Sequence, residues 1–322
     1  MKKRDVLVVY PARPKAMAQL EESYTLHRYD EADDKQAFLA EYGPRCEAIV
    51  TNGHAALTRA HLDHLPNLKI VCCSSAGFEP IDVDALQERG IWLTNSSVAL
   101  CDDVADMALL LTLATRRQLV AAHEYVRSGD WGRKGMYPLL SSMSGKRVGI
   151  AGIGTIGQAI ARRFEPLGLE IGYTARSARD LPWSYFPDVQ ALAEWADILV
   201  AIVPGGAATQ GMFNKPVLEA LGPTGSFINV ARGSVVDEPA LIEALSTGKL
   251  GSAALDVYLN EPNPNPALTQ LPNVTLYPHH ASGTVETRDA MAQTVVDNLA
   301  AFFAGKPLFT PVFDLPETAV SL

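Results

Sequence analysis

Residues 149–164 constrain the fold of this chain more than any other stretch, because the sequence GIAGIGTIGQAIARRF runs from apolar residues through three spaced glycines into a helical pattern. A strand, a glycine turn and a helix in this order form a phosphate-binding unit. In such a unit Gly152 makes the tight turn, Gly154 lets the backbone approach a pyrophosphate, and Gly157 lets the helix pack on the strand. Free N–H groups at the positive end of the helix would then hold the diphosphate.

The residues around the glycines complete a strand–helix–strand unit. Residues 146–152 form an apolar strand, residues 155–168 a helical pattern that ends at a glycine, and residues 170–175 a second strand. This context favours dinucleotide binding over the alternative, a glycine-rich turn without a ligand.

The end of the second strand distinguishes between two dinucleotides. Ala175 stands 23 residues after Gly152, close to the offset of about 20 at which an NAD site places an acidic residue for the ribose 2′-hydroxyl. Arg176, Ser177 and Arg179 follow it, and two cations with a hydroxyl could bind a 2′-phosphate. We therefore expect NADPH as the preferred cofactor, with NAD as the alternative if the arginines are only solvated surface charges.

Short apolar runs that alternate with helical patterns predict two parallel α/β sheets. The strand-like runs cover residues 5–10, 24–29, 48–53, 68–75 and 91–95, and then residues 146–152, 170–175, 197–203, 226–231, 252–257 and 274–278. A long helical pattern at residues 101–126 leads into the second sheet, and another at about 284–305 leads back. We expect one domain of residues 1–98 completed by 287–322 and one of residues 99–286, with one cleft between them.

The composition excludes several classes of partner. The chain has 322 residues, a formal net charge of −9 and no block of like charges, whereas binding to nucleic acid or an anionic membrane needs clustered Lys and Arg. The apolar run at residues 107–115 is far shorter than the roughly 20 residues of a membrane span. Cys46, Cys72, Cys73 and Cys101 show neither metal-ligand nor disulfide spacing. We expect a cytoplasmic protein with a small-molecule partner, no metal and no membrane anchor.

Three further stretches of the second domain extend the glycine motif: NVARGSVVDE at residues 229–238, ALDVYLNEP at residues 254–262 and LYPHHASGT at residues 276–284. In this order they resemble the D-isomer-specific 2-hydroxyacid dehydrogenases, in particular the glyoxylate, hydroxypyruvate and hydroxyphenylpyruvate reductase branch. The resemblance covers nearly the whole chain and includes SSAGFEPID at residues 74–82 and DDVADMALLL at residues 102–111. It implies two doubly wound parallel-sheet domains, a flavodoxin-like substrate domain and a Rossmann dinucleotide-binding domain.

The resemblance maps the catalytic roles onto Arg232, Glu261 and His279, and the chemistry requires these residue types. A 2-oxoacid presents a carboxylate and a ketone, and the planar donors of Arg232 can hold the first while polarising the second. A histidine titrates near neutrality and can protonate the developing alkoxide, while a paired carboxylate at Glu261 would keep His279 protonated and oriented. His280 departs from the family, which more often has an aliphatic residue there. His279 is assigned because it directly follows Pro278.

Further contacts are expected from loops that follow the strands. Besides Arg232 and His279, the substrate is expected to contact Asn52, Gly53, Ser75, Ala76 and Gly77. Besides the three glycines and the cations after Ala175, the cofactor is expected to contact Thr155, Ile156, Val203, Pro204, Val230, Ala231 and Asp256. By resemblance, residues 129–140 lie near the subunit interface of a homodimer.

These features predict a reductase that transfers hydride from NADPH to small 2-oxoacids such as glyoxylate or hydroxypyruvate and forms D-2-hydroxyacids. Two alternatives stay open. One is a reductase of bulkier aromatic or branched 2-oxoacids. The other is a dinucleotide-sensing binding protein of the same fold without turnover, against which the presence of all three catalytic residue types speaks. Closure of the domains, with hinges near residues 95–102 and 285–290, is expected to exclude water from the reaction.

Overall fold

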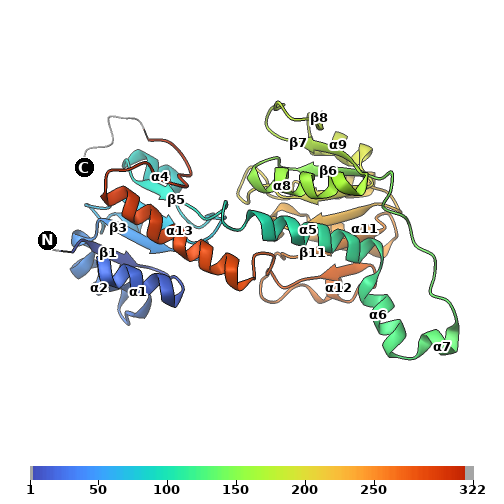
Figure 1. The fold of residues 1–322 in the computed structure, drawn as a ribbon, viewed down its shortest axis with the longest axis horizontal. Coiled ribbons are helices and arrows are strands. Elements are labelled where there is room, and N and C mark those ends of the chain that lie inside the picture. Colours follow the sequence, from blue (N-terminus) through green and yellow to red (C-terminus); the bar gives the residue numbers. More distant parts are fainter. Residues whose placement is uncertain (1–2, 316–322) are drawn as a thin grey trace. The chain divides into compact units, whose positions relative to one another are not determined.

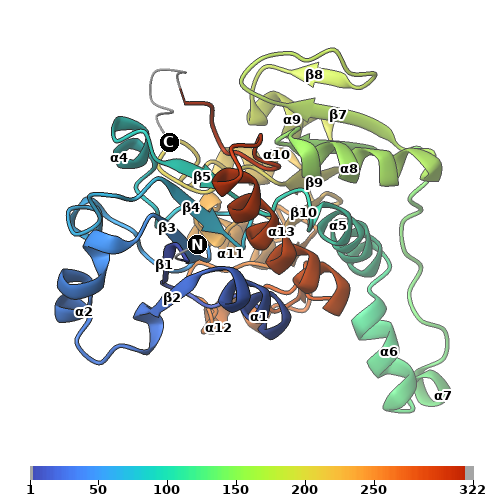
Figure 2. The same cartoon turned by 60° about the vertical axis from the view of Figure 1, so that its left-hand side comes forward.

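The computed structural model describes residues 3–315 (Figure 1). The chain divides after Leu100 and after Ala281 into two compact units. Unit 1 contains the chain up to Leu100 together with the chain from Ser282 onward, and unit 2 contains Cys101–Ala281. Within each unit, helices cover both faces of a parallel sheet (Figure 2), so the predicted fold class is confirmed.

Unit 1 is built on five parallel strands in the order β2-β1-β3-β4-β5. These strands are β1 (Asp5–Val8), β2 (Thr25–Arg28), β3 (Ala48–Thr51), β4 (Ile70–Cys73) and β5 (Trp92–Thr94). Each lies within a run that the sequence predicts as a strand. The central strands β3 and β4 are buried along their whole length, because a parallel sheet covered on both faces needs apolar side chains on both.

Alternate side chains of this sheet enter two separate cores. In β4, Ile70 and Cys72 belong to one core, and Val71 and Cys73 belong to the other. The first core includes side chains of α1 and α13, and the second includes those of α2, α3 and α4. These helices are α1 (Pro14–Ser23), α2 (Lys35–Tyr42), α3 (Arg59–Leu62), α4 (Val83–Glu88) and α13 (Val285–Phe303).

The segment after α13 lies against the end of β5. Val312 N–H donates to the Leu93 carbonyl at 2.8 Å, and the Thr310 hydroxyl donates to the Asn95 carbonyl at 2.6 Å. The fully buried Asn298 of α13 accepts two backbone N–H bonds from this segment. The last described residues are thus part of the unit in which the chain begins.

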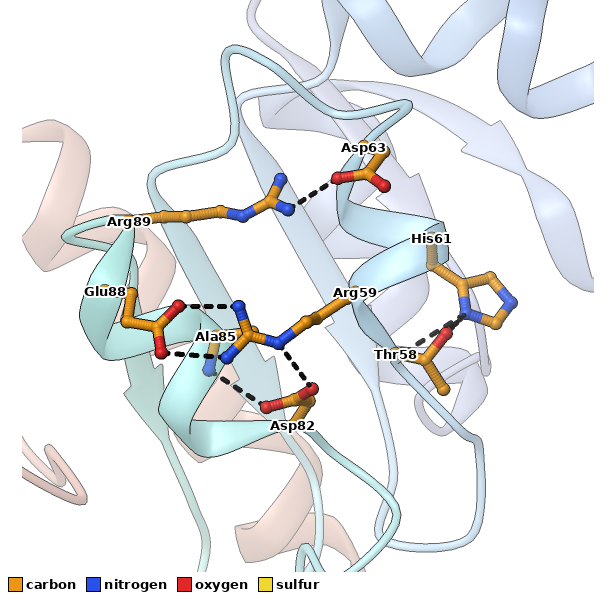
Figure 3. Close-up of polar contacts among 8 residues, drawn as sticks. All are labelled: Thr58, Arg59, His61, Asp63, Asp82, Ala85, Glu88 and Arg89. Atoms are coloured by element: carbon orange, nitrogen blue, oxygen red, sulfur yellow. Dashed lines mark hydrogen bonds and ion pairs between the residues drawn. The ribbon is translucent and has the colours of Figure 1, made fainter.

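An exposed ion-pair network joins α3 to α4 on the surface of unit 1 (Figure 3). Arg59 donates two hydrogen bonds to Glu88, at 2.6 and 2.8 Å, and its Nε lies 3.5 Å from Asp82. Beside them, Arg89 donates to Asp63 at 2.6 Å. The side chains of Arg59 and Glu88 are 50% and 60% exposed.

Unit 2 is built on seven parallel strands in the order β12-β11-β10-β9-β6-β7-β8. These strands are β6 (Arg147–Ala151), β7 (Glu170–Thr174), β8 (Ser184–Phe186), β9 (Ile198–Ala201), β10 (Ser226–Asn229), β11 (Ser252–Leu255) and β12 (Val274–Leu276). The sequence prediction missed β8. This edge strand has only three residues, two of them exposed, so it shows no apolar run.

The helices of unit 2 cover both faces of this sheet. α5 packs along α8 and crosses β10 and β11, whereas α9, α10 and α11 share an apolar core with the sheet. They are α5 (Cys101–Arg116), α8 (Thr155–Phe164), α9 (Val189–Trp195), α10 (Lys215–Ala220), α11 (Glu238–Ser246) and the short α12 (Pro266–Thr269). Single 3₁₀ turns occur at Tyr29–Glu31, Gly43–Arg45, Glu165–Leu167 and Gly233–Val235.

The single helix predicted over residues 101–126 is wrong. α5 ends at Arg116 and α6 (Leu119–Arg127) begins three residues later, because Gln118 has φ +45°, and an L-residue in this left-handed conformation cannot continue a right-handed helix. α6 and α7 (Asp130–Lys134) contain no buried residue and extend away from the sheet of unit 2 (Figure 1). We call residues 119–139 the arm. Within the described part of the chain, no helix is both long and apolar enough to cross a membrane.

Candidate active site

The loops that carry the predicted site residues of unit 2 all leave its sheet at the carboxyl ends of the strands, and we call this side of the sheet the site edge. They follow β6, β7, β9, β10, β11 and β12, whose pairings are all parallel, so that their carboxyl ends lie on the same side. The strand order reverses between β6 and β9. In open α/β sheets, ligands bind outside the carboxyl ends of the strands at such a reversal.

The glycine loop forms a tight strand-to-helix turn at this edge. Gly152 has φ +102°, a backbone conformation that L side chains rarely adopt. A Cβ atom on Gly157 would lie 2.0 Å from the Gly152 carbonyl oxygen, so α8 can pack this closely only with glycine there. A Cβ atom on Gly154 would meet no heavy atom within 4 Å. Because α8 starts without a side-chain cap, its first N–H groups, at Thr155 and Ile156, can be satisfied by an anion.

The loop after β7 presents cations to solvent. Arg176, Ser177 and Arg179 are exposed. The backbone of Arg179 is tied back to β7, because its N–H donates to the Tyr173 hydroxyl at 2.9 Å and its carbonyl accepts from that hydroxyl at 3.1 Å. Neither guanidinium has an ion pair within residues 3–315, so both can bind an anion without breaking a protein contact.

The other predicted cofactor contacts lie at the ends of two central strands. Val203 and Pro204 follow β9, and Val230 and Ala231 follow β10. Val230 and Ala231 are buried, whereas Pro204 is exposed. All four lie on the side of the sheet that carries the glycine loop.

Glu261 and His279 come from the loops after β11 and β12 and form a hydrogen-bonded pair. His279 Nδ1 lies 2.5 Å from Glu261 Oε2, and Glu261 Oε1 accepts the backbone N–H of Tyr258 at 2.9 Å. His279 also has φ +50°, a strained conformation that persists only where the surroundings hold it. Its N–H donates to the Asp256 carbonyl at 2.7 Å. The pair through Nδ1 turns Nε2 away from the carboxylate.

The surroundings of Glu261 keep its carboxyl group ionised. Burial acts to raise its pKa, but the hydrogen bonds from His279 and from the Tyr258 N–H and the charges of His279 and Arg232 outweigh burial, and the pKa lies below its usual range. At neutral pH the loop after β11 therefore presents a negative charge to the His279 ring.

Asp256, predicted to contact the cofactor, holds the backbone that follows His279. Its side chain is buried, and its two oxygens accept the N–H groups of His280 at 2.8 Å and Ala281 at 3.1 Å. Burial raises the pKa of Asp256 against the effect of these two bonds. Both carboxylate oxygens are thus engaged by the loop that carries His279, and a contact with the cofactor stays a prediction.

Arg232 follows β10 in a loop held by a buried asparagine. Asn229 donates from its side-chain amide to the Arg232 carbonyl at 2.9 Å and accepts the Ala231 N–H at 3.0 Å. The Arg232 guanidinium donates to the Ala231 carbonyl at 2.7 Å and is half-buried. The backbone at this position is therefore fixed from inside the sheet.

His280 lies apart from the carboxylate that pairs with its neighbour. It is exposed, its ring centroid is 6.5 Å from that of Tyr277, and its backbone N–H is the group held by Asp256. Two adjacent histidines could also suggest a metal site, but among residues 3–315 no group of three His, Cys, Asp or Glu side chains could hold a metal ion. The geometry therefore supports the assignment of His279.

In unit 1, the predicted substrate residues lie together in the loops after β3 and β4. The buried Asn52 accepts the two backbone N–H groups that follow Gly53 in the chain. Gly53 N–H donates to the Ser75 hydroxyl at 3.0 Å, and a Cβ atom on Gly53 would lie 2.1 Å from the Gly77 carbonyl oxygen. Ala76 lies between these two partners. The two loops can approach this closely only because residue 53 is glycine.

Tyr258 and Gly233 are two residues of this edge that the sequence interpretation missed. Tyr258 contacts the loops of Glu261 and His279, and Gly233 packs against the Tyr258 backbone. Both stand inside the quoted motif stretches. Nothing in the sequence predicts these contacts, because they join residues that follow different strands.

Comparison with known proteins identifies a family model and close relatives. Residues 109–281 match the model of the D-isomer specific 2-hydroxyacid dehydrogenase, NAD binding domain. The chain is 42% identical over 311 residues to the 2-ketogluconate reductase of Gluconobacter oxydans (strain 621H), and the match covers 96% of this chain and 99% of that protein. It is 43% identical over 308 residues to glyoxylate/hydroxypyruvate reductase A HPR2 of Arabidopsis thaliana, and the match covers 95% of this chain and 98% of that protein.

A solved structure matches nearly the whole chain. The crystal structure of the NADPH-dependent glyoxylate/hydroxypyruvate reductase of Sinorhizobium meliloti, in complex with NADP and malonate, has a TM-score of 0.88 and 42% identity to this chain. The match covers 97% of each chain.

Proposed function

The chain belongs to the D-isomer-specific 2-hydroxyacid dehydrogenase family, and from this premise we propose that it reduces small 2-oxoacids such as glyoxylate and hydroxypyruvate to D-2-hydroxyacids with NADPH. The observation that carries the proposal is the Glu261–His279 pair, on the sheet edge that also carries Arg232 and the glycine loop. The names of the Arabidopsis thaliana and Sinorhizobium meliloti relatives support the substrate class, and the latter supports the cofactor.

The residues at this edge fit a phosphorylated dinucleotide. The open side of Gly154 and the first N–H groups of α8 would hold the diphosphate. Arg176 and Ser177, with Arg179, would hold the 2′-phosphate through charge-assisted hydrogen bonds. When bound, NADPH supplies the hydride for the substrate carbonyl.

The three catalytic side chains have different proposed roles. Arg232 would bind the substrate carboxylate and polarise its carbonyl, because a guanidinium presents planar, permanently charged donors. His279 would give a proton from Nε2 to the carbonyl oxygen in reduction and take it back in oxidation. The ionised Glu261 on Nδ1 stabilises the protonated ring and fixes its orientation. We therefore expect reduction to need the protonated form of His279.

A substrate panel tests this function. Initial rates with glyoxylate, hydroxypyruvate, pyruvate and phenylpyruvate, each with NADPH and with NADH, give the specificity constants directly. We expect the highest kcat/KM with glyoxylate or hydroxypyruvate and NADPH. Absence of turnover on every 2-oxoacid, with NADPH still bound, would favour the dinucleotide-sensing alternative.

A second candidate is a reductase of larger 2-oxoacids. The supporting observation is the 42% identity to a 2-ketogluconate reductase over almost its whole length, since that protein is named for a substrate much longer than glyoxylate. Adding 2-ketogluconate to the panel distinguishes the two candidates. A kcat/KM for 2-ketogluconate above that for glyoxylate would assign the larger substrate.

Unit 1 is proposed to complete the substrate site. The loops after β3 and β4 carry Asn52, Gly53 and Ser75–Gly77, and backbone N–H groups beside glycine can approach a carboxylate closely. Closure of the two units, with the chain bending near residues 95–102 and 285–290, would exclude water from the reaction. Small-angle scattering should show a smaller radius of gyration with NADPH and a 2-oxoacid analogue than without them, and an unchanged radius would contradict closure.

We propose that two copies of the chain form a homodimer through the arm. It exposes Leu119, Val120, Val126, Trp131, Met136 and Leu139, each more than half exposed. Its helices bury none of their own residues, and exposed large apolar side chains gathered in one segment favour an interaction site. A second copy of the chain is the proposed partner. Light scattering should give a dimer for the wild type and a monomer for the double variant Met136→Asp, Leu139→Asp.

A cytoplasmic location is proposed from the cysteines. All four, Cys46, Cys72, Cys73 and Cys101, are buried thiols without a disulfide, which suits a reducing compartment. Burial raises the pKa of the Cys72 thiol to about 12, so that this thiol stays protonated. Fractionation of the source cells with an antibody to the chain would test the location.

A further inference from the structure

Tyr258 contacts the loops that carry both members of the catalytic pair. Its backbone N–H donates to Glu261 Oε1 at 2.9 Å. Its hydroxyl lies 2.9 Å from the Tyr277 carbonyl and 3.1 Å from the Leu255 carbonyl, and it accepts the Tyr277 N–H at 3.1 Å. One half-buried tyrosine thus bonds to the carboxylate of one loop and to the backbone two residues before His279 in the next.

The Tyr277 carbonyl connects the hydroxyl to His279 itself. This carbonyl accepts the His279 N–H at 3.2 Å as well as the Tyr258 hydroxyl. Since His279 has φ +50°, the bonds that hold its backbone decide where the ring lies. Burial raises the pKa of Tyr258 to about 12, so the hydroxyl keeps its proton, and with it the bond, throughout the neutral range.

Tyr258 also packs against the backbone of Gly233, the residue that follows Arg232. A Cβ atom on Gly233 would lie 1.9 Å from the Tyr258 carbonyl carbon and 2.0 Å from its oxygen. The peptide groups of these two residues are therefore in direct contact. A shift of the Tyr258 backbone must move Gly233, and Arg232 is the neighbour of Gly233 in the chain.

We propose that Tyr258 is a positioning residue. Through its hydroxyl and its N–H it aligns His279 and Glu261 for proton transfer, and through its contact with Gly233 it aligns Arg232 for substrate binding. The inference rests on the proposed function, since it takes these three residues as the catalytic groups. The competing interpretation is that Tyr258 only fills space beside the apolar core that it borders. The hydroxyl decides between them, because packing requires the ring but not the oxygen.

The first experiment replaces Tyr258 by phenylalanine. Tyr258→Phe keeps the ring and removes the bond to the Tyr277 carbonyl, whereas the Tyr277 N–H keeps its bond to the Leu255 carbonyl at 2.8 Å. The loss of one neutral hydrogen bond corresponds to about three- to tenfold in an equilibrium or rate. We expect kcat for glyoxylate reduction to fall by this factor and its pH profile to move to lower pH, because the looser pair stabilises the protonated ring less. The KM for NADPH should not change. Tyr24→Phe, at another half-buried tyrosine in unit 1, is the matched control and should leave kcat and the pH profile unchanged.

A second readout does not depend on turnover. Histidine ring signals of the protein without cofactor, followed by NMR against pH, should show the His279 resonance titrating at lower pH in Tyr258→Phe than in the wild type. A wild-type kcat and an unchanged His279 titration in a folded Tyr258→Phe would overturn the proposal. A variant that loses its fold by circular dichroism would also overturn it, because the hydroxyl would then be a structural brace.

A third variant tests the backbone contact. Gly233→Ala forces the backbone of residue 233 or of Tyr258 to shift, and we expect it to reduce kcat at least as much as Tyr258→Phe while NADPH binding is retained. An unchanged kcat would overturn the part of the proposal that concerns Arg232. If the wild type turns over no 2-oxoacid, the proposed function fails, whereas a failure of the positioning role leaves the wild-type rates intact and shows only in the variants.

Discussion

Each unit of the molecule holds a carboxylate bonded to a basic side chain, and the two pairs differ in what they can do. In unit 1, Glu88 accepts two bonds from Arg59, and the side chains are 60% and 50% exposed (Figure 3). In unit 2, Glu261 meets His279 with side chains 31% and 33% exposed. A guanidinium keeps its charge at any pH at which the protein is folded, whereas an imidazole changes charge near neutrality. Only the second pair can therefore transfer a proton.

The backbone around the two pairs differs as well. Arg59 and Glu88 project from the ends of α3 and α4, and their contact could break without moving either helix. Glu261 and His279 lie in loops, where His279 has a left-handed backbone and the buried Asp256 holds the N–H groups that follow. Strain that is held in place on several sides is a mark of functional sites. The contact distance alone would not have separated the two pairs.

The largest effect is expected when the titrating member of the second pair is removed. His279→Ala should reduce turnover by roughly 10²- to 10⁴-fold, the usual contribution of a positioned general acid. NADPH binding, followed by fluorescence titration, should stay nearly unchanged because the glycine loop is untouched. His280→Ala is the matched control and should keep most of the activity. Full activity in His279→Ala, with loss in His280→Ala, would reverse the assignment of the two histidines.

Much of the fold was predictable because parallel strands covered on both faces read as continuous apolar runs. The two failures have local causes. Ser184–Phe186 is a half-exposed edge strand of three residues, and the helix break at Gln118 occurs at a residue without the turn propensity of Gly, Asn or Pro. The left-handed conformation of Gln118 sets the direction in which the arm leaves α5. The residues around position 118 do not predict this direction.

The candidate site was predictable only in part. Arg232, Glu261 and His279 could be located because their motifs occur in a family order along the chain. Asp256 also stood in a motif, but its two backbone partners depend on how β11 and β12 lie side by side. The same holds for Tyr258. A motif indicates which residue types are present, whereas their partners follow from strand order.

A smaller effect, on cofactor preference, is expected from replacing Arg176, a cation that has no carboxylate partner among the described residues. It adds a third case to the comparison of the two pairs. Arg176 is exposed and, among residues 3–315, forms no ion pair. If it binds a 2′-phosphate, with charge-assisted bonds worth about 1.5–3 kcal/mol each, NADPH should exceed NADH by at least about tenfold in kcat/KM. The double variant Ala175→Asp, Arg176→Ala should remove most of this preference and leave kcat little changed. Equal use of both cofactors by the wild type would show that the arginines are ordinary surface charges.

The two carboxylates can be compared directly by neutralising each. Glu261→Gln removes the negative charge beside His279, so the protonated ring is less stable, and the pH profile of reduction should move to lower pH. Glu88→Gln is the same substitution in the exposed pair and should leave the profile unchanged. Rates measured from pH 5 to 9 with both variants test the difference. A Glu261→Gln profile that coincides with that of the wild type would show that the pair does not control protonation.

The smallest effect is expected from breaking the exposed pair. Arg59→Ala should leave kcat and KM unchanged and alter the melting temperature by little more than the precision of the measurement, because exposed ion pairs are screened by solvent and salt. The hydrogen bond from Arg59 holds the pKa of Glu88 below its usual range. A lowered carboxylate pKa contributes stability above the ordinary value, about 4.3 for Glu, and that stability is lost as the pH falls through the lowered value. Any difference between the wild type and Arg59→Ala in urea unfolding should therefore be present at pH 7 and vanish well below pH 4. A loss of activity in Arg59→Ala at neutral pH would show that the network on α3 and α4 is coupled to the chemistry after all.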